Sequence, residues 1–226
     1  DRDYNYTYAG LQQLLDKYLV KDRTTNKVYE TPQFQIMVLS MTVHMFYDKK
    51  TRLKYVKNLY EDISNMKISL STPVSAGVRT PSRQYSSCCK IQVDDSLDSI
   101  FYSSVAVGKY GSKKAGIGLD VSSIRALGSK IRNGEVAHTG ITPFLKMFQS
   151  TLLSCSQGGI RKGSGTVFVP FWHKEIEDII VLKNNKGTDD NRVRHIDYAV
   201  SFCRLFYQRV IQNKDISLFS PSDVPG

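Results

Sequence analysis

The stretch Tyr85-Ser-Ser-Cys-Cys-Lys-Ile-Gln-Val93 decides the fold of this chain. It predicts a strand, and Asp95-Ser96, shortly after it, can cap a helix that runs to about Tyr110. Ala115 to Val121 predicts a second strand behind that helix. Because a strand, a helix and a strand follow one another, this part of the chain is expected to form a parallel sheet or barrel.

The alternation of strands and helices continues toward the C-terminus. The further expected elements are a helix that starts at Thr142-Pro143, a strand over Thr166 to Phe171, helices over Lys174 to Leu182 and Asp197 to Ile211, and short strands near Arg192 to Ile196 and Ile216 to Phe219. Strands that alternate with helices favour a parallel sheet or barrel, and no internal repeat stands out in this order.

The first part of the chain is expected to be helical. Apolar residues recur there at helical spacing, and Thr31-Pro32 is typical of a helix start. Phe34 to Tyr47 is the most apolar stretch, but it is shorter than the roughly 20 residues of a membrane span and predicts a buried helix. Prolines and a glycine over Ser69 to Arg83 end this pattern. We therefore expect a helical segment over residues 1–70 and an α/β part over residues 71–226.

Composition and charge limit the class of protein. The chain has 226 residues, 41% of them hydrophobic and 23% charged, which excludes disordered and low-complexity proteins. The formal net charge of +10 favours an anionic partner, although the cations occur in short groups and form no long basic tract. The first residue is Asp1 and residues 220–226 have a loop composition, so both ends are expected to be cut from a longer protein.

The cysteines and histidines show no pattern of a metal site. Cys88, Cys89, Cys155 and Cys203 lack the spacing of a zinc site or a disulfide scaffold, so a reducing cytoplasm fits best and no bound metal is expected. Cys88 and Cys89 are neighbours in the expected strand, where successive side chains face opposite sides, so only one can point into a pocket. The usual role of either is a small buried hydrophobic residue. The scattered histidines are expected to be structural.

Three loops combine glycines with cations and are candidates for phosphate binding. The loop from Ser156 to Gly165 contains Arg161 and Lys162, and either a nucleotide contact or a mobile connection fits it. Gly111 to Gly118 is more typical of a helix C-cap followed by a tight turn. In the third loop Arg125 and Arg132 could clamp a polyphosphate, although a solvated basic loop is the commoner case.

A series of longer motifs runs through the chain in one order. They are Ser71-Thr-Pro73, Gly77-Val-Arg-Thr-Pro81, Gln84 to Cys88, Asp95-Ser-Leu-Asp-Ser-Ile100, Ala115-Gly-Ile-Gly118, Ile124-Arg-Ala-Leu-Gly-Ser129, Ser154-Cys-Ser-Gln-Gly-Gly159, Lys183-Asn-Asn185 and Asn191-Arg-Val-Arg-His195. Together they resemble the large subunit of class I ribonucleotide reductase. The resemblance runs from about Ser71 to the last residue, and the helical segment fits more loosely. So many matches in one order make the resemblance highly specific.

The resemblance implies a fold and an activity. The fold is a helical region followed by a ten-stranded α/β barrel, of which this chain would supply the first half. The activity is the radical-based reduction of ribonucleoside diphosphates to deoxyribonucleoside diphosphates. Cys88 matches the thiol that reduces the substrate and becomes half of a disulfide, whereas the family pattern asks for no cysteine at Cys89. Thr72, Ser87 and Gly116 correspond to further substrate contacts.

The resemblance also implies an allosteric nucleotide site. Its residues correspond to Asp95, Ser96, Leu97, Arg125 and Arg132, and its ligand is a nucleoside triphosphate effector, a deoxynucleotide or ATP, expected with Mg²⁺. The loop that carries information from the effector base to the substrate base corresponds to Ser156, Gln157, Gly158, Gly159 and Arg161. No cofactor is expected to bind this chain directly.

The partners implied by the resemblance are several. They are the remainder of the large subunit, a second copy in a homodimer, the small subunit whose metal centre supplies the radical, and thioredoxin or glutaredoxin as reductant. No membrane contact is expected.

Two alternative functions stay open. A catalytically inactive regulatory paralogue is one, although the retained Cys88 speaks against it. A basic nucleic-acid-binding module is the other, although the cations cluster in glycine loops between strands and helices.

Overall fold

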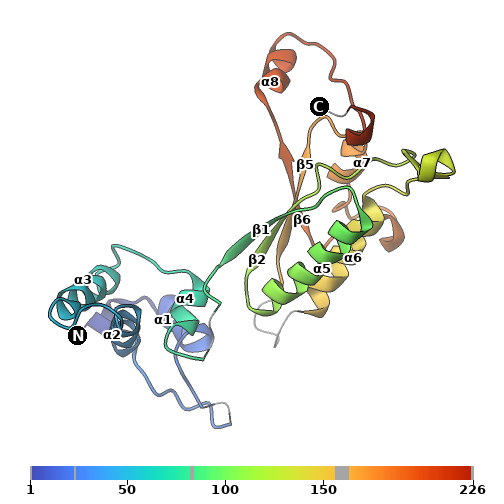
Figure 1. Ribbon diagram of the computed structural model, residues 1–226. Coiled ribbons are helices and arrows are strands. Elements are labelled where there is room, and N and C mark those ends of the chain that lie inside the picture. Colours follow the sequence, from blue (N-terminus) through green and yellow to red (C-terminus); the bar gives the residue numbers. More distant parts are fainter. Residues whose placement is uncertain (1, 23, 82–83, 156–162, 225–226) are drawn as a thin grey trace. The chain divides into compact units, whose positions relative to one another are not determined.

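The chain folds into two compact units, Asp1–Ser87 and Cys88–Gly226 (Figure 1). The computed structural model describes residues 2–22, 24–81, 84–155 and 163–224. The first unit is helical and the second is α/β, which confirms the expected order of the two parts. The first unit includes the helix Thr72–Gly77.

The helical unit contains four α-helices and a 3-10 turn among its described residues. They are η1 (Arg2–Asn5), α1 (Tyr8–Lys17), α2 (Pro32–Val43), α3 (Arg52–Ser64) and α4 (Thr72–Gly77). The expected start of α2 is confirmed, because the Thr31 hydroxyl accepts a hydrogen bond from the Phe34 N–H at 3.3 Å, with Pro32 at the first helical position. Ile36 and Leu39 of α2 are buried, as is Val56 of α3, where these two helices pack.

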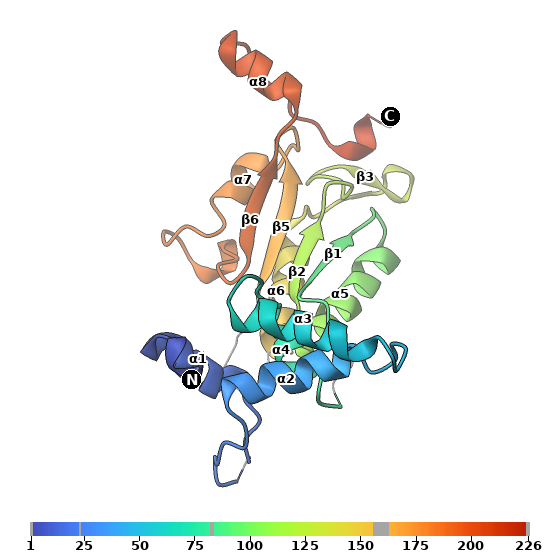
Figure 2. The same ribbon diagram turned by 90° about the vertical axis from the view of Figure 1, so that its left-hand side faces the viewer.

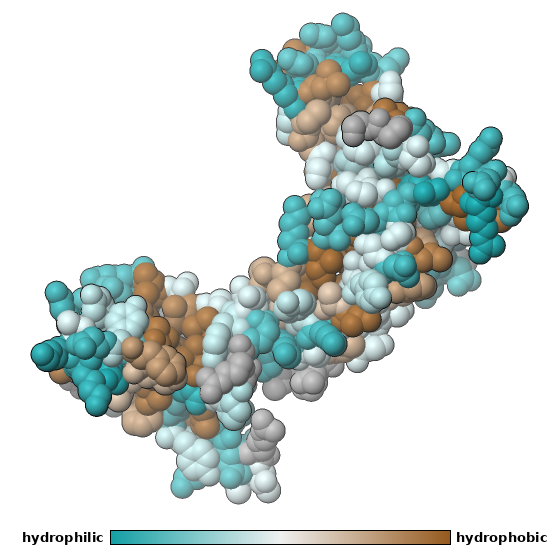
Figure 3. All heavy atoms as spheres, in the orientation of Figure 1, coloured by the Kyte–Doolittle hydropathy of each residue, from teal (hydrophilic) through white to brown (hydrophobic). Residues whose placement is uncertain are grey.

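The prediction that Phe34 to Tyr47 is a buried helix was correct for only one face of α2. Ile36, Leu39 and Ser40 are buried, whereas Phe34 and Met41 are 58% and 55% exposed. Hydrophobic residues therefore reach the surface of the helical unit (Figure 3). The helix is apolar on all sides, but this unit supplies packing partners for one side only.

A buried ion pair holds the C-terminal part of the helical unit. Arg79 and Glu30 pair through their side chains, which are 4% and 5% exposed. The guanidinium also donates to the carbonyl oxygens of Ser75 (2.6 Å) and Tyr18 (2.8 Å), and the Glu30 carboxylate accepts from the Val20 N–H at 2.6 Å. This one pair therefore joins the residues after α4 to the end of α1 and to the loop before α2.

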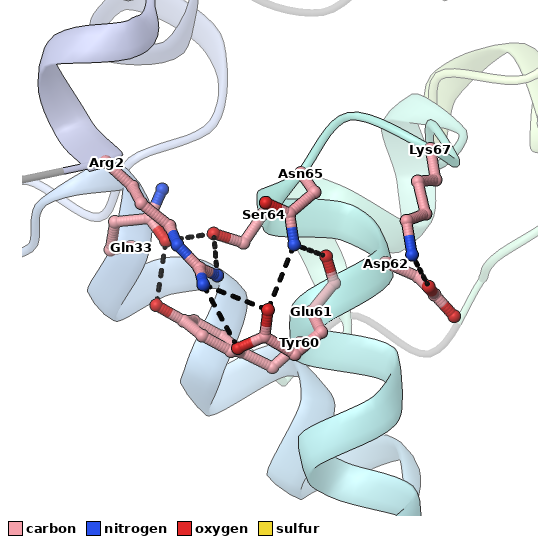
Figure 4. Close-up of polar contacts among 8 residues, drawn as sticks. All are labelled: Arg2, Gln33, Tyr60, Glu61, Asp62, Ser64, Asn65 and Lys67. Atoms are coloured by element: carbon pink, nitrogen blue, oxygen red, sulfur yellow. Dashed lines mark hydrogen bonds and ion pairs between the residues drawn. The ribbon is translucent and has the colours of Figure 1, made fainter.

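A second polar cluster joins η1, α2 and α3 (Figure 4). Arg2 donates to Ser64 Oγ at 3.0 Å and to Glu61 Oε2 at 2.9 Å, and its guanidinium lies 5.6 Å from the Tyr60 ring centroid. The Tyr60 hydroxyl donates to Gln33 Oε1 at 2.9 Å. These contacts lie near the surface of the unit, unlike the Arg79 pair.

We predict that replacing Arg79 with Met destabilises the protein by about 3 to 5 kcal/mol, because the Glu30 carboxylate is left buried without a cation. Urea unfolding followed by circular dichroism measures this change. Lys67→Gln is the matched control, since it removes the exposed ion pair with Asp62 and should change the stability by less than about 1 kcal/mol. Equal losses of unfolding free energy in the two variants would contradict the argument that the Arg79–Glu30 pair matters because it is buried.

The α/β unit is built on a four-stranded parallel sheet with the strand order β1-β2-β5-β6 (Figure 2). The strands are β1 (Cys88–Gln92), β2 (Gly116–Asp120), β5 (Gly165–Pro170) and β6 (Asp197–Ser201). The helices are α5 (Leu97–Ser112), α6 (Thr142–Ser154), α7 (Ile176–Ile180) and α8 (Arg204–Ile211). A two-stranded hairpin of β3 (Lys130–Ile131) and β4 (Val136–Ala137) carries the turn η2 (Arg132–Gly134), and the remaining turns are η3 (Asp189–Asn191) and η4 (Pro221–Asp223).

The core of this unit lies on one face of the sheet, where α5 and α6 pack (Figure 1). Leu119 of β2 and Val167 of β5 are fully buried there against Leu145 and Phe148 of α6. Because side chains alternate along a strand, the intervening residues point to the opposite face, which no described helix of this unit covers with a core of this kind. The sheet is therefore packed on one side and open on the other.

Several expected elements near the C-terminus were wrong. Asp197 to Ile211 is not one helix, because Tyr198 and Val200 pack on the core as β6 pairs with β5, and α8 begins only at Arg204. Arg192 to Ile196 is an irregular segment, with Val193 and Ile196 buried. The strand near Ile216 to Phe219 is reduced to one bridge between His173 and Phe219. Pairing with distant strands, rather than local propensity, determined the secondary structure of these segments.

Candidate active site and nucleotide site

Cys88 and Cys89 begin β1 and lie on opposite faces of the sheet, as the strand period predicted. Cys89 is half-buried and packs against the core, whereas Cys88 is exposed on the open face. Parallel pairing sets Cys88 in register with Gly116 of β2. The open face is therefore where a ligand can meet the Cys88 thiol.

The open face forms a shallow hollow of about 470 Å³ around Cys88. Its lining includes Lys90 of β1, Gly116 and Gly118 of β2, Thr166 and Phe168 of β5, and Asp197 of β6. The Phe168 ring lies over Gly118, where a Cβ atom would be only 3.2 Å from Cε2, and the Lys90 ammonium lies 5.8 Å from the ring centroid. Glycines on β2 thus leave room for a ring and for a ligand beside the thiol.

Sequence reasoning identified Cys88 and Gly116 but missed Lys90, Gly118 and Phe168. A signal for Lys90 was present, because it follows Cys88 by two residues and strand periodicity puts both on one face. Phe168 had no such signal, since its place over Gly118 depends on the pairing of β2 with β5. The other predicted substrate residues are Thr72, whose hydroxyl bonds the Tyr18 hydroxyl at 3.1 Å in the helical unit, and Ser87, directly before Cys88.

The surroundings of the Cys89 thiol disfavour its thiolate form. Burial raises the pKa of Cys89, and the neighbouring Cys88 raises it further. The structure holds Cys88, Cys89, Cys155 and Cys203 as thiols. Because the thiolate is the nucleophile, Cys89 is the less reactive member of the adjacent pair.

We predict that iodoacetamide alkylates Cys88 faster than Cys89 at a pH of about 8, since Cys88 is exposed and the pKa of Cys89 is raised. The variants Cys88→Ala and Cys89→Ala separate the two rates, which mass spectrometry of the labelled chain measures. The Cys89→Ala variant should label at the wild-type rate. A faster reaction in Cys88→Ala than in Cys89→Ala would contradict this assignment.

The predicted effector residues Asp95, Ser96, Leu97 and Arg125 come together at the start of α5. The Ser96 hydroxyl caps the helix by accepting from the Ser99 N–H at 3.1 Å, and Leu97 is 59% exposed. The Asp95 carboxylate accepts from Arg125 Nε at 2.7 Å and from the Arg125 N–H at 3.0 Å. This arrangement puts an acid, a hydroxyl and a guanidinium at one helix N-terminus.

Arg132 lies on the hairpin that follows Arg125. The hairpin is linked to Arg125 because the guanidinium donates to the Lys130 carbonyl oxygen at 2.8 Å. Arg132 is exposed and, like Asn133, adopts a left-handed backbone conformation, with φ of 50° and 56°. Lys130–Ile131 and Val136–Ala137 pair as strands that the sequence did not predict. Arg125 thus lies beside the start of α5, and Arg132 lies on the hairpin that Arg125 contacts.

Three further predictions concern the coupling loop, the absence of a metal site and the absence of a membrane span. Ser156, Gln157, Gly158, Gly159 and Arg161 lie outside the described residues. In residues 2–22, 24–81, 84–155 and 163–224, no group of three or more His, Cys, Asp or Glu side chains could hold a metal ion. None of the helices in those same ranges has the length and apolar content that crossing a membrane requires.

The fold and the site define a class of protein: a parallel α/β sheet that presents a strand thiol on its open face, preceded by a helical unit. The chain belongs to the ribonucleotide reductase family. Residues 4–83 match the family described as ribonucleotide reductase, all-alpha domain, and residues 86–226 match the ribonucleotide reductase barrel domain.

Similar proteins are found in bacteria and in a phage. The chain is 54% identical over 225 residues to the ribonucleoside-diphosphate reductase subunit alpha of Haemophilus influenzae. It is 53% identical to the ribonucleoside-diphosphate reductase 1 subunit alpha of Escherichia coli, and 52% identical to the corresponding subunit alpha of Enterobacteria phage T4. Each match covers all of this chain and 30% of the relative.

Proposed function

We propose that this chain contributes the substrate-reducing thiol and the effector site of a ribonucleoside-diphosphate reductase large subunit. The observation that carries the proposal is the position of Cys88, exposed on the open face of the sheet beside Gly116 in a hollow. Its neighbour Cys89 also borders the hollow, but its side chain packs against the core, so Cys88 is the member of the pair that points to the open face.

The proposed reaction reduces a ribonucleoside diphosphate with two thiols. The C2′–O bond breaks, its oxygen leaves as water, and a hydrogen takes its place at C2′. Cys88 and a second cysteine, contributed by the rest of the barrel, lose two electrons and two protons and join as a disulfide. A thioredoxin-type reductant then returns the disulfide to thiols, and the radical that starts the reaction comes from the small subunit.

The second half of the barrel is the proposed cover for the open face. The described sheet ends at β1 on one edge and at β6 on the other, and both edges carry backbone groups that a further strand can pair. The chain spans about 30% of the length of the relatives that it matches, which leaves ample sequence for the remaining strands. The four cysteines are free of disulfides, which fits work in a reducing cytoplasm.

The start of α5 is the proposed site of a nucleoside triphosphate effector. Asp95 can accept from a ribose hydroxyl, while Arg125 and Arg132 can hold phosphates together with Mg²⁺. The apolar side chains of Leu97, Phe101 and Val105 follow one stripe of α5 and are 59%, 53% and 54% exposed. This stripe is the proposed contact with a second large subunit, which would place the effector beside the dimer interface.

We predict that Cys88→Ser abolishes turnover of a ribonucleoside diphosphate with dithiothreitol as reductant, because a hydroxyl cannot form the disulfide. Cys89→Ser is the matched control and should keep most of the activity, since its side chain faces the core. The assay is deoxynucleotide formation by the complete large subunit with its small subunit. Equal loss in both variants, or full activity in Cys88→Ser, would refute the proposed role of Cys88.

We predict that Arg125→Gln weakens the binding of a nucleoside triphosphate by roughly tenfold or more, because a charge-assisted contact to phosphate is lost. Substrate choice should also respond less to the effector. Equilibrium dialysis with labelled dTTP measures the binding, and Lys54→Gln, which removes an exposed cation from α3, should bind normally. Unchanged binding in Arg125→Gln would count against this site.

A further inference from the structure

Glu175 is a buried acid that the proposed chemistry does not use. It directly precedes α7 and is 6% exposed, and within the described residues no Lys or Arg forms an ion pair with it. Its carboxylate instead accepts from the Leu127 N–H at 2.9 Å and from the Ile141 N–H at 3.2 Å to each oxygen. One carboxylate therefore holds two backbone sites that lie on either side of the β3–β4 hairpin.

His173 and Ser220 hold the segment around Arg125 in addition to Glu175. His173 is fully buried; its Nδ1 accepts from the Glu175 N–H at 3.1 Å, so Nε2 carries the proton and donates to the Ile124 carbonyl oxygen at 3.0 Å. Ser220, also fully buried, accepts from the Ala126 N–H at 3.0 Å. The segment around Arg125 is thus anchored to buried polar groups on both sides of that residue.

The segment between the two Glu175 contacts is the hairpin that carries Arg132. The hairpin closes through the Gly128 N–H to the His138 carbonyl oxygen at 2.9 Å and the His138 N–H to the Ser129 carbonyl oxygen at 2.8 Å. The Arg125 guanidinium also donates to the carbonyl oxygen of Lys130 in β3. The position of the hairpin base therefore sets where Arg132 lies, and the Lys130 contact ties the Arg125 guanidinium to the same hairpin.

Gly140 makes the close approach of Glu175 possible. It has a φ of +85°, and a Cβ atom there would lie 2.4 Å from Glu175 Oε1. A buried carboxylate without a cation is costly, and a neutral or apolar side chain would pack at lower cost. Oε2 accepts from both backbone segments and Oε1 accepts from the Ile141 N–H as well, so an amide in this place would turn its NH2 group toward a backbone N–H.

We propose that Glu175 is a positioning residue for the nucleoside triphosphate site: it fixes the base of the hairpin so that Arg125 and Arg132 face one phosphate chain. This inference rests on the effector site proposed above. Glu175 itself touches no ligand in this role, because its carboxylate is buried behind the hairpin and occupied by the two N–H groups.

The test is Glu175→Gln in the complete large subunit with its small subunit. An amide keeps the size of the side chain but has one accepting oxygen and brings two N–H donors against backbone N–H groups. We expect the dissociation constant for dTTP with Mg²⁺, measured by calorimetry, to rise roughly tenfold, which is within the usual range for coupled sites. The turnover number at saturating dTTP should stay within about twofold of the wild type, which separates positioning from catalysis.

Three further variants make the result specific. Val169→Ala, which shortens a core side chain and removes no polar contact, should lower the melting temperature without changing dTTP affinity. Gly140→Ala should weaken dTTP binding, because the added methyl group displaces the carboxylate while its charge is kept, and it replaces Glu175→Gln if that variant does not fold. Arg125→Gln should lose dTTP affinity whether or not Glu175 is a positioning residue.

The outcomes separate this inference from the proposed function. Normal dTTP affinity in a folded Glu175→Gln or Gly140→Ala protein, with affinity lost in Arg125→Gln, would overturn the positioning role and leave the effector site standing. Loss of affinity in Val169→Ala to the same degree would also overturn it, since general destabilisation would then explain the effect. Failure of the wild-type protein to bind dTTP would overturn the effector site and the inference with it.

Discussion

The parallel pairing of β1 with β2 is the constraint on which the rest of the site depends. It sets Cys88 beside Gly116 and Cys89 beside Ile117, and the core that packs on Ile117 and Leu119 keeps that register. A shift of one residue would turn Cys89 toward the open face and bury Cys88. The apolar face of the sheet thus decides which thiol a ligand can meet, although the ligand never touches that face.

The two faces of the sheet differ for a physical reason. The side against α5 and α6 is a closed apolar core, whereas the other side carries a thiol, glycines and the charged residues Lys90 and Asp197. Small residues such as Gly116 and Gly118 leave space on that side, and the Phe168 ring takes part of it. Such a face suits a polar ligand enclosed by further strands better than it suits a second hydrophobic layer.

The chain keeps two buried carboxylates by different means. Glu30 is paired with the Arg79 guanidinium and joins parts of the helical unit, whereas Glu175 is compensated by backbone N–H groups of the α/β unit. In both cases the acid fixes segments that carry little regular structure. Polar contacts of this kind give the backbone of a loop a defined position in addition to the packing of its side chains.

Local sequence patterns were enough to predict the helical segment, the strand β1 and the helix α5 with its Ser96 cap, and the opposite directions of Cys88 and Cys89, because caps and side-chain periodicity are local properties. Its motifs also indicated the family. Only the tertiary structure decided that Asp197–Ser201 is a strand, that Phe168 covers Gly118, and that Glu175 clamps the hairpin of Arg132. These features depend on contacts between residues far apart in the chain, and no local pattern of side chains encodes them.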